Sequence, residues 1–287
     1  MPELPEVETV RRGLAPIMEG FAIERIEVRR NDLRVAVSDD FAPSLEGRTL
    51  KKLGRRAKYL VGEFDNGTIL LAHLGMSGRI LIDIDRGYNQ TAELSNSAYL
   101  TKKHEHIVFY LENGATVGFY DPRRFGLMVL TDQAGFKNHQ LIRDLGPEPI
   151  NHDFTGAVLA SALRRKKTSI KAALLDQRVV AGIGNIYACE ALFLAGISPR
   201  RIASNVQGKR ANKLAKSIRD VLLKAIDAGG SSINDHVSPS GDLGYFQHFF
   251  SVYGREGHPC PKSDCGRSIA SIRQSGRSTF YCPNCQR

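Results

Sequence analysis

The 287-residue sequence contains no tryptophan, and its apolar residues never form an uninterrupted run long enough to cross a membrane. The first ten residues are charged and lack the apolar segment of a secretory signal. The sequence also shows no internal repeat and no low-complexity stretch. Its apolar content of 42% is that of an ordinary packed domain. We therefore expect a cytoplasmic, folded protein in which Phe or Tyr makes any aromatic contact to a ligand.

Basic residues outnumber acidic ones, 40 to 30, which gives a formal net charge of +10. They cluster at 29–34, at 51–58, at 164–167 and through the last thirty residues. Any one cluster is compatible with an ordinary solvated surface. Several separated clusters that fold onto one face would form a track for a polyanion, so the distribution favours a nucleic-acid partner.

The chain divides into three zones by composition. Residues 21–130 contain short β-rich runs separated by Gly, Asn and Asp, with Asn-Gly hairpin signals in "FDNGT" and "LENGA". Residues 135–228 show helical spacing of apolar residues, and a cysteine-bearing segment ends the chain. We predict an α+β protein with an N-terminal β-sandwich and an edge helix, a helical domain and a C-terminal β-hairpin module. The predicted boundaries are 1–133, 134–230, a loop and linker over 231–254, and 255–287.

The edge helix begins the chain. Pro5 suits a first helical turn, and the carboxylates of Glu6 and Glu8 favour the positive end of the helix dipole. Val7, Val10 and Leu14 form one apolar stripe, and we expect Gly13 and Pro16 to mark the far end.

Four of the five cysteines follow the pattern C-x4-C-x16-C-x2-C, at Cys260, Cys265, Cys282 and Cys285. Two close pairs separated by the length of a hairpin are typical of a structural zinc site with four thiolates. Such a site leaves no open position for catalytic water, so the catalytic groups must lie elsewhere. The fifth, Cys189, lies on an apolar helix face, where burial in the core is expected.

Three short segments suit contacts with a nucleic acid. "HLGMSG" (73–78) ends an apolar run, and alone it indicates only a strand followed by a turn. "DPRRFG" (121–126) places two arginines and Phe125 at a turn, which suits phosphate contact and insertion between bases. A solvated basic turn with Phe125 facing the core is the alternative. "GIGN" (182–185) sets glycines before a helix start, a geometry that presents backbone N–H groups to phosphate.

The first residues can also be chemical reagents. Removal of Met1 would expose the secondary amine of Pro2, and α-amino groups have a pKa of about 8. Such an amine can attack a sugar C1′ and form a Schiff base, while a carboxylic acid and a lysine move protons. Glu3 and Lys58 are candidates for those roles. If Met1 is retained, the Pro2 nitrogen is a tertiary amide and cannot act as a nucleophile.

Eight ordered motifs resemble the bacterial formamidopyrimidine-DNA glycosylase family over nearly the whole chain: "PELPEVETVRRGL", "RRAKYL", "HLGMSGR", "DPRRFG", "GIGNIYACEALF", "GYFQ", "VYGREG" and "GRSTFYCPNCQ". The resemblance implies a β-sandwich, a helix–two-turn–helix domain and a zinc finger with one structural Zn²⁺. It implies a monomer that excises oxidised purines, chiefly 8-oxoguanine and formamidopyrimidines, from double-stranded DNA. Cleavage of the abasic site by β,δ-elimination follows.

The resemblance also implies residue roles. Pro2 would be the nucleophile, Glu3 the acid–base group, Lys58 the β-elimination residue, and Arg277 the phosphate contact for δ-elimination. His73, Lys171 and Asn185 would clamp phosphates, and Met76, Arg123 and Phe125 would fill the gap left by the flipped nucleotide. The further DNA-binding positions implied are His104 and Lys166, and the segment 236–247 would close over the flipped base.

Two features depart from the family pattern. The first cysteine pair is spaced by four residues where two are commoner, and residues 82–100 are longer than the usual connection. A related endonuclease-eight type acts on oxidised pyrimidines, but Leu4 and "GYFQ" favour the purine branch. A non-catalytic binder of damaged DNA is the alternative from a different class.

Overall fold

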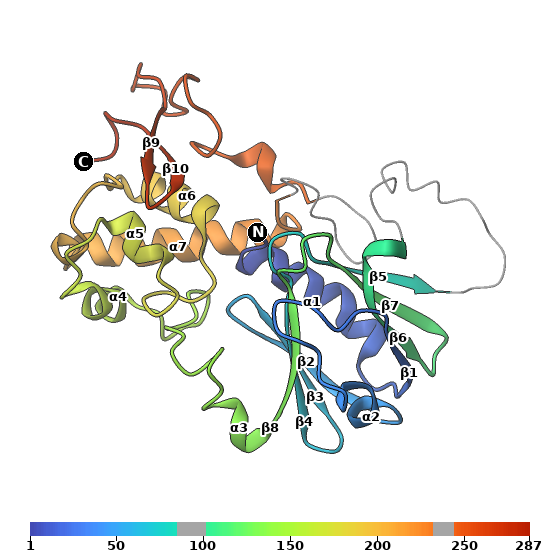
Figure 1. The fold of residues 1–287 in the computed structure, drawn as a ribbon. Helices are drawn as coiled ribbons and strands as arrows, with labels where there is room; N and C mark the ends of the chain where they lie inside the picture. Colours follow the sequence, from blue (N-terminus) through green and yellow to red (C-terminus); the bar gives the residue numbers. More distant parts are fainter. Residues whose placement is uncertain (85–101, 232–243) are drawn as a thin grey trace. The chain divides into compact units, whose positions relative to one another are not determined.

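The computed structural model describes residues 1–84, 102–231 and 244–287. The chain forms two compact units (Figure 1). The first contains Met1–Arg143 with Gly229–Gly244, and the second contains Asp144–Ala228 with Tyr245–Arg287. The four predicted domain boundaries are finer than this division and stay a prediction. No helix in the described ranges has both the length and the apolar composition that a membrane span requires.

Helix α1 (Leu4–Met18) begins where the sequence predicts, with Pro5 in its first turn. It does not end at Pro16, however, but continues through this proline to Met18. The reason is packing, because the side chain of Met18 is 6% exposed and belongs to the same apolar core as Val10 and Leu14. The apolar stripe therefore outweighs the hydrogen bond that a proline inside a helix removes.

Two antiparallel sheets form the first unit, each with four strands. Their orders are β1-β6-β7-β5 and β2-β3-β4-β8. The strands are β1 (Ile23–Val28), β2 (Leu50–Arg56), β3 (Tyr59–Phe64), β4 (Thr68–His73), β5 (Arg79–Ile84), β6 (Glu105–Leu111), β7 (Ala115–Tyr120) and β8 (Leu127–Asp132). Short helices α2 (Phe41–Leu45), η2 (Lys102–His104) and α3 (Gln133–Phe136) lie between or after them.

Both Asn-Gly hairpins are confirmed. Gly67 and Gly114 have φ angles of 83° and 80° in the β3–β4 and β6–β7 connections. One apolar core fills the first unit and includes residues of α1 and of both sheets. The predicted sandwich with its edge helix is therefore the observed architecture.

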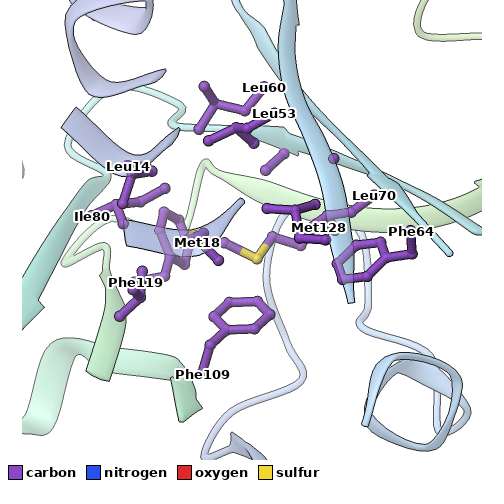
Figure 2. Close-up of a pocket in the computed structure, with 14 residues that line it drawn as sticks. Leu14, Met18, Leu53, Leu60, Phe64, Leu70, Ile80, Phe109, Phe119 and Met128 are labelled. Carbon is purple, nitrogen blue, oxygen red and sulfur yellow. The ribbon is translucent and has the colours of Figure 1, made fainter. Parts of the chain in front are cut away.

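A small cavity of about 30 Å³ lies within this core (Figure 2). Its walls are apolar side chains, among them Met18, Phe119 and Met128, which point toward one another in the close-up. An apolar space of this size stays dry and is far too small for a nucleobase. This cavity is therefore a feature of core packing and not a binding site for a nucleobase.

The second unit begins with helices, as the apolar spacing predicts. They are α4 (Gly156–Leu163), α5 (Ile170–Leu175), α6 (Asn185–Ala195), η3 (Ala203–Asn205), α7 (Lys209–Asp227) and η4 (Phe246–Phe249). Helix α6 ends at Gly196 in the left-handed conformation, with φ 68°. Gly229 and Gly230, with φ angles of 72° and 78°, follow the end of α7.

The cysteine module belongs to the same unit. Its predicted hairpin consists of β9 (Ala270–Gln274) and β10 (Arg277–Tyr281), which pair around Ser275 and Gly276. Cys189 of α6 is 1% exposed and packs with Ile269 and Cys282 of the module in one small apolar core. The buried position expected for Cys189 is confirmed, and the contact joins α6 to the module.

Candidate active site and nucleic-acid interface

The first turn of α1 holds Pro2 and Glu3 in buried positions. Glu3 is the N-cap residue, and its backbone N–H donates to Oε2 of Glu6 at 2.9 Å in a reciprocal capping box. Met1 is 48% exposed, so its removal would open the Pro2 nitrogen to the surface. The capping box thus fixes the start of α1 directly after Pro2.

Glu6 also connects this helix start to a distant segment of the same unit. Its Oε1 accepts hydrogen bonds from the N–H and from the hydroxyl of Ser231, both at 2.9 Å. A Cβ on Gly230 would lie 3.3 Å from Glu6 Oε1, and Gly230 has φ 78°. Glycine therefore lets the backbone pass close to the Glu6 carboxylate at the base of the segment that follows Ser231.

Lys58 lies in the turn between β2 and β3 and is 5% exposed. The preceding residue, Ala57, adopts a left-handed φ of 54°, which is unusual for a residue other than glycine. Nη1 of Arg55 donates to the carbonyl of Ala57 at 2.7 Å and holds the turn. The backbone of this turn directs a lysine side chain inward where a surface lysine would be the ordinary expectation.

The α-amino group of Met1 has a pKa below its usual value of 8.0. Burial is the largest cause, and the charges of Lys58 and Arg123 lower the pKa further, while those of Glu3 and Glu6 raise it. These effects require the four side chains to lie near the start of the chain. After removal of Met1 the Pro2 amine would lie close to these same groups, and a lowered pKa would favour the unprotonated form that a nucleophile needs.

His73, at the end of β4, lies beside the Tyr59 ring, with 4.8 Å between the ring centroids. Its Nδ1 accepts a hydrogen bond from the Gly75 N–H at 2.9 Å, so the ring proton of the neutral form is on Nε2. Burial, assisted by the charges of Lys58 and Arg34, lowers the pKa of His73 to about 4. At neutral pH His73 therefore offers a neutral N–H donor.

Arg34 also lies at this site, although the sequence did not single it out and showed it only as a member of the basic cluster at 29–34. It is exposed, and its backbone N–H donates to the carbonyl of Gly126 at 3.2 Å. Its positive charge acts on both His73 and Tyr59. The loop that follows β1 thus brings a guanidinium to the edge of the site.

Met76, Arg123 and Phe125 are all exposed, Met76 and Phe125 at 45% each. The guanidinium of Arg123 lies over the Phe125 ring, 4.8 Å from its centroid. The alternative in which Phe125 faces the core is therefore wrong. The two loops present an apolar and cationic tip of the kind that can enter a base stack.

Three candidate DNA-binding residues, Asn185, Lys166 and Lys171, lie in the second unit. Asn185 begins α6, and its side-chain N–H donates to the carbonyl of Ser278 at 3.0 Å. The amine of Lys166 pairs with Asp176 at 2.8 Å. Lys171 is 0% exposed. The phosphate contact expected for it stays a prediction.

Arg277, the first residue of β10, is exposed next to the turn of the hairpin. Helix α6 also holds the segment that leads into this module, through a buried carboxylate. The side chain of Glu190 accepts hydrogen bonds from the N–H groups of three successive residues, Ser251, Val252 and Tyr253, at 2.8–2.9 Å. The hydrogen bond from Asn185 to Ser278 of β10 joins α6 to the hairpin that carries Arg277.

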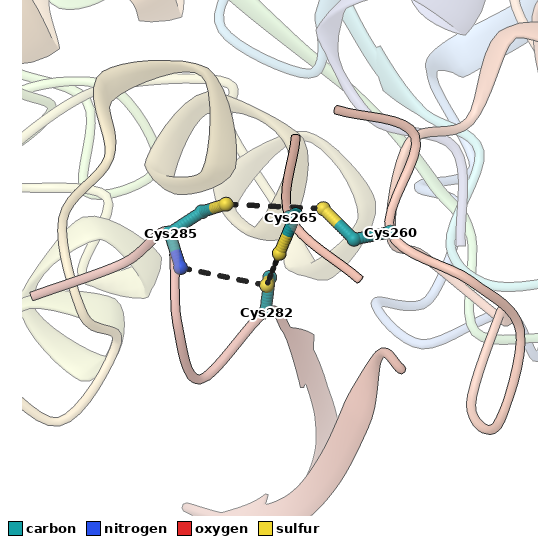
Figure 3. A group of neighbouring side chains, drawn as sticks. All are labelled: Cys260, Cys265, Cys282 and Cys285. Atoms are coloured by element: carbon teal, nitrogen blue, oxygen red, sulfur yellow. Dashed lines mark hydrogen bonds between the residues drawn. The ribbon is translucent and has the colours of Figure 1, made fainter. Parts of the chain in front are cut away.

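The four predicted cysteines converge in the second unit, with all four sulfurs within 4.8 Å of one another (Figure 3). Sγ of Cys260 lies 3.9 Å from Sγ of Cys285, and Sγ of Cys265 lies 3.4 Å from Sγ of Cys282. Sulfurs at the corners of a Zn²⁺ tetrahedron with bonds of 2.3 Å are about 3.8 Å apart. The unusual first spacing therefore still produces a set of donors that fits zinc.

Most of the predicted site residues lie in the described parts of the chain. His104 is half-buried in η2, and its carbonyl accepts from the Asp121 N–H at 3.0 Å. Of the predicted insertion at 82–100, residues 85–100 lie outside the described residues. The predicted closing segment 236–247 lies outside them as far as residue 243.

Three family models match successive parts of the chain. They are the formamidopyrimidine-DNA glycosylase N-terminal domain over residues 1–128, the H2TH domain of the same enzyme over 145–237, and the zinc finger found in FPG and IleRS over 257–287. A sandwich with a buried helix start, an H2TH domain and a four-cysteine finger defines a three-part protein of the H2TH class. The chain belongs to the formamidopyrimidine-DNA glycosylase family.

Individual relatives agree with this assignment over their full lengths. The chain is 51% identical to the formamidopyrimidine-DNA glycosylase of Ruegeria pomeroyi and 50% identical to that of Afipia carboxidovorans, with 100% of each chain covered. Among solved structures it resembles the Lactococcus lactis Fpg in a complex with DNA that contains an abasic site. That match has a TM-score of 0.85 at 34% identity and covers 99% of both chains. The zinc-finger match and the four converging sulfurs assign one structural zinc ion to the module.

We expect His73 to stay neutral until the pH falls well below 6. NMR titration of its ring should give a pKa close to the value of about 4 that follows from its surroundings. Because the unfolded chain takes up this proton first, near pH 6.5, the His73 contribution to stability is lost as the pH falls from about 6.5 through 4. A midpoint near 6.5 in the folded protein would contradict the buried, cation-flanked environment.

Substitution of one finger cysteine should abolish zinc binding. We expect the Cys282→Ser variant to contain far less than the one zinc ion per chain of the parent, measured by atomic absorption, because three thiolates hold the metal poorly. Cys189→Ala is the matched control, since Cys189 is buried beside the module but is not among the four. Equal zinc content in Cys282→Ser and the parent would rule out the four-thiolate site.

Proposed function

We propose that this protein is a DNA glycosylase and abasic-site lyase that removes oxidised purines, 8-oxoguanine and formamidopyrimidines, from duplex DNA. The observation that carries the proposal is the start of the chain, where Pro2 and Glu3 are held at the first turn of α1 close to Lys58. Family membership supports the reaction class, and curated relatives over the full length bear the glycosylase name.

Base excision begins once Met1 has been removed. The lone pair of the Pro2 nitrogen attacks C1′ of the damaged nucleotide, and the bond from C1′ to the base breaks with its electron pair leaving on the base nitrogen. Glu3 supplies a proton to the departing base, and its carboxylate then takes the proton from the Pro2 nitrogen and delivers it to O4′ as the sugar ring opens. The product is an iminium ion that joins Pro2 to the open sugar. Burial of Glu3 at 3% exposure keeps this proton transfer out of bulk water.

Strand cleavage follows from the same iminium ion. Loss of a C2′ proton expels the 3′ phosphate in β-elimination, a step in which Lys58 takes part. Loss of the C4′ proton then expels the 5′ phosphate in a second elimination, and exposed Arg277 neutralises the charge of that phosphate. Water then hydrolyses the imine and regenerates the Pro2 amine.

Phosphate clamping and gap filling are assigned to separate groups of residues. His73 and Asn185 contact phosphates on either side of the lesion, His73 through its neutral Nε2–H and Asn185 at the start of α6. Met76, Arg123 and Phe125 enter the space left by the extruded nucleotide. His104 and Lys166 make further backbone contacts. Lys171 is assigned to the phosphate-clamping group with His73 and Asn185.

The net charge of +10 suits a partner with the charge density of duplex DNA. We expect the protein to act as a monomer in the cytoplasm of its bacterium, bound to the nucleoid, because chromosomal DNA is its substrate. We also propose that the domain boundaries are 1–133, 134–230, 231–254 and 255–287.

Two alternatives are less well supported. An endonuclease-eight-like enzyme for oxidised pyrimidines is disfavoured, because the similar curated relatives are formamidopyrimidine-DNA glycosylases. A non-catalytic binder of damaged DNA would have no use for a helix start that holds Pro2 and Glu3 beside Lys58. A covalent trapping experiment distinguishes the proposed enzyme from a non-catalytic binder.

Borohydride reduction should trap the processed protein on duplex DNA with an 8-oxoguanine·C pair, visible as a band of lower mobility in a denaturing gel. A form with a short peptide left ahead of Met1 should give no adduct, because the Pro2 nitrogen is then an amide. Pro2→Gly should give less adduct, because its primary amine differs in shape and basicity from proline.

Binding of the extended form to DNA with a tetrahydrofuran abasic analogue controls for an intact DNA face. We expect this binding to remain within about threefold of the parent's, equivalent to less than about 0.7 kcal/mol. If the processed parent itself yields no adduct, the proposed enzymatic function is wrong.

A further inference from the structure

The two loops that carry Met76, Arg123 and Phe125 are joined beneath their exposed side chains. We call residues 73–78 and 121–126 together the wedge. Below the tip lies Asp121, which is 0% exposed and is the most deeply buried carboxylate among the described residues. Neither the sequence nor the proposed reaction gives this side chain a task.

The carboxylate of Asp121 binds both loops. Its Oδ1 accepts a hydrogen bond from the Ser77 hydroxyl at 2.5 Å and a longer one from the Arg123 N–H at 3.3 Å. Its Oδ2 accepts from the Gly126 N–H at 2.7 Å. Ser77 Oγ itself accepts from the Arg123 N–H at 3.2 Å, which closes the network across the two loops.

Glycine at two positions allows the loops to touch through their backbones. A Cβ on Gly75 would lie 2.4 Å from the carbonyl carbon of Phe125, and Gly75 has φ 65°. A Cβ on Gly126 would lie 2.6 Å from the Phe119 ring and 2.9 Å from the carbonyl oxygen of His73. Neither site has room for a side chain, so the loops meet closely enough for one carboxylate to serve both.

The backbone of Asp121 fixes the wedge to the sheet below it. Its N–H donates to the carbonyl of His104, and its carbonyl accepts from Nε2 of His106 at 2.8 Å. The same carbonyl accepts from the N–H of Arg124, whose φ of 57° is left-handed. This turn sends the side chains of Arg123 and Phe125 to one side while Arg124 pairs with Asp32.

We propose that Asp121 is the positioning residue of the wedge, binding the Met76 loop to the Arg123–Phe125 loop so that their side chains enter the base stack as one rigid body. This inference rests on the proposed function and adds to it the residue that sets the geometry of nucleotide extrusion. A buried charge suits the role because hydrogen bonds to a carboxylate are shorter and stronger than those to a neutral acceptor.

Two substitutions weaken opposite sides of the network. Asp121→Asn keeps the size of the side chain but turns one acceptor into an N–H₂ donor. With the amide nitrogen facing Gly126, that N–H loses its acceptor. Ser77→Ala removes the hydroxyl that links the other loop and is the milder change, since Ser77 is only half-buried. Asp40→Asn is the matched control, because Asp40 is exposed and its side chain makes no capping hydrogen bond.

The test compares single-turnover rates on two duplexes. One carries 8-oxoguanine paired with C, which must be unpaired and unstacked before excision, and the other carries a preformed abasic site with no base to extrude. We expect each wedge variant to lose about tenfold or more on the paired lesion and less than about threefold on the abasic site, since extrusion costs a few kcal/mol. Asp40→Asn should match the parent on both.

A second readout reports insertion directly. 2-Aminopurine placed opposite a tetrahydrofuran site becomes more fluorescent when the wedge unstacks it, and both variants should reduce this rise while circular dichroism stays unchanged. Equal losses on the two duplexes, or an unchanged fluorescence rise, would overturn the positioning role. If the parent itself cleaves neither duplex, the proposed function fails instead, so the two failures are distinguishable.

Discussion

Three hydrogen bonds to the carboxylate of Glu6 fix the position of the chain's first nitrogen atoms. One comes from the Glu3 N–H in the same helical turn, and two come from Ser231, which is 225 residues away. A chain terminus is ordinarily frayed, and a frayed amine cannot be aimed at a sugar carbon. The buried Glu6 carboxylate makes the terminus part of the packed structure, and the chemistry that we propose for Pro2 and Glu3 depends on that.

Strained backbone occurs beside the other proposed functional residues. Within the described ranges, three residues other than glycine have left-handed φ angles, namely Ala57, Arg124 and Ser275. Ala57 precedes Lys58, Arg124 lies between Arg123 and Phe125, and Ser275 begins the turn that leads to Arg277. Such conformations persist only where surrounding contacts determine them, and they are common at functional sites. The scaffold thus aims these side chains through tight turns.

Local signals in the sequence were sufficient for much of this structure. The Asn-Gly hairpins, the start of α1, the glycines before α6 and the four-cysteine hairpin all depend on residues close together in the chain, and all are present. Features that depend on contacts between distant segments could not be predicted from the sequence. The extension of α1 past Pro16, the burial of Lys171 and the partners of Glu190 and Asp121 arise from packing between distant segments. The type of a charged residue in a motif does not reveal whether its side chain is exposed or buried.

We propose that the Pro2 nitrogen forms the covalent bond to DNA. Tandem mass spectrometry of the borohydride-reduced complex, after nuclease and trypsin digestion, tests it most directly. We predict that the sugar remnant lies on the nitrogen of Pro2, in a peptide that begins at Pro2, ends at Arg11 and lacks Met1. A remnant on Lys58 or Lys171, or a reacted N-terminal peptide that still carries Met1, would contradict the account.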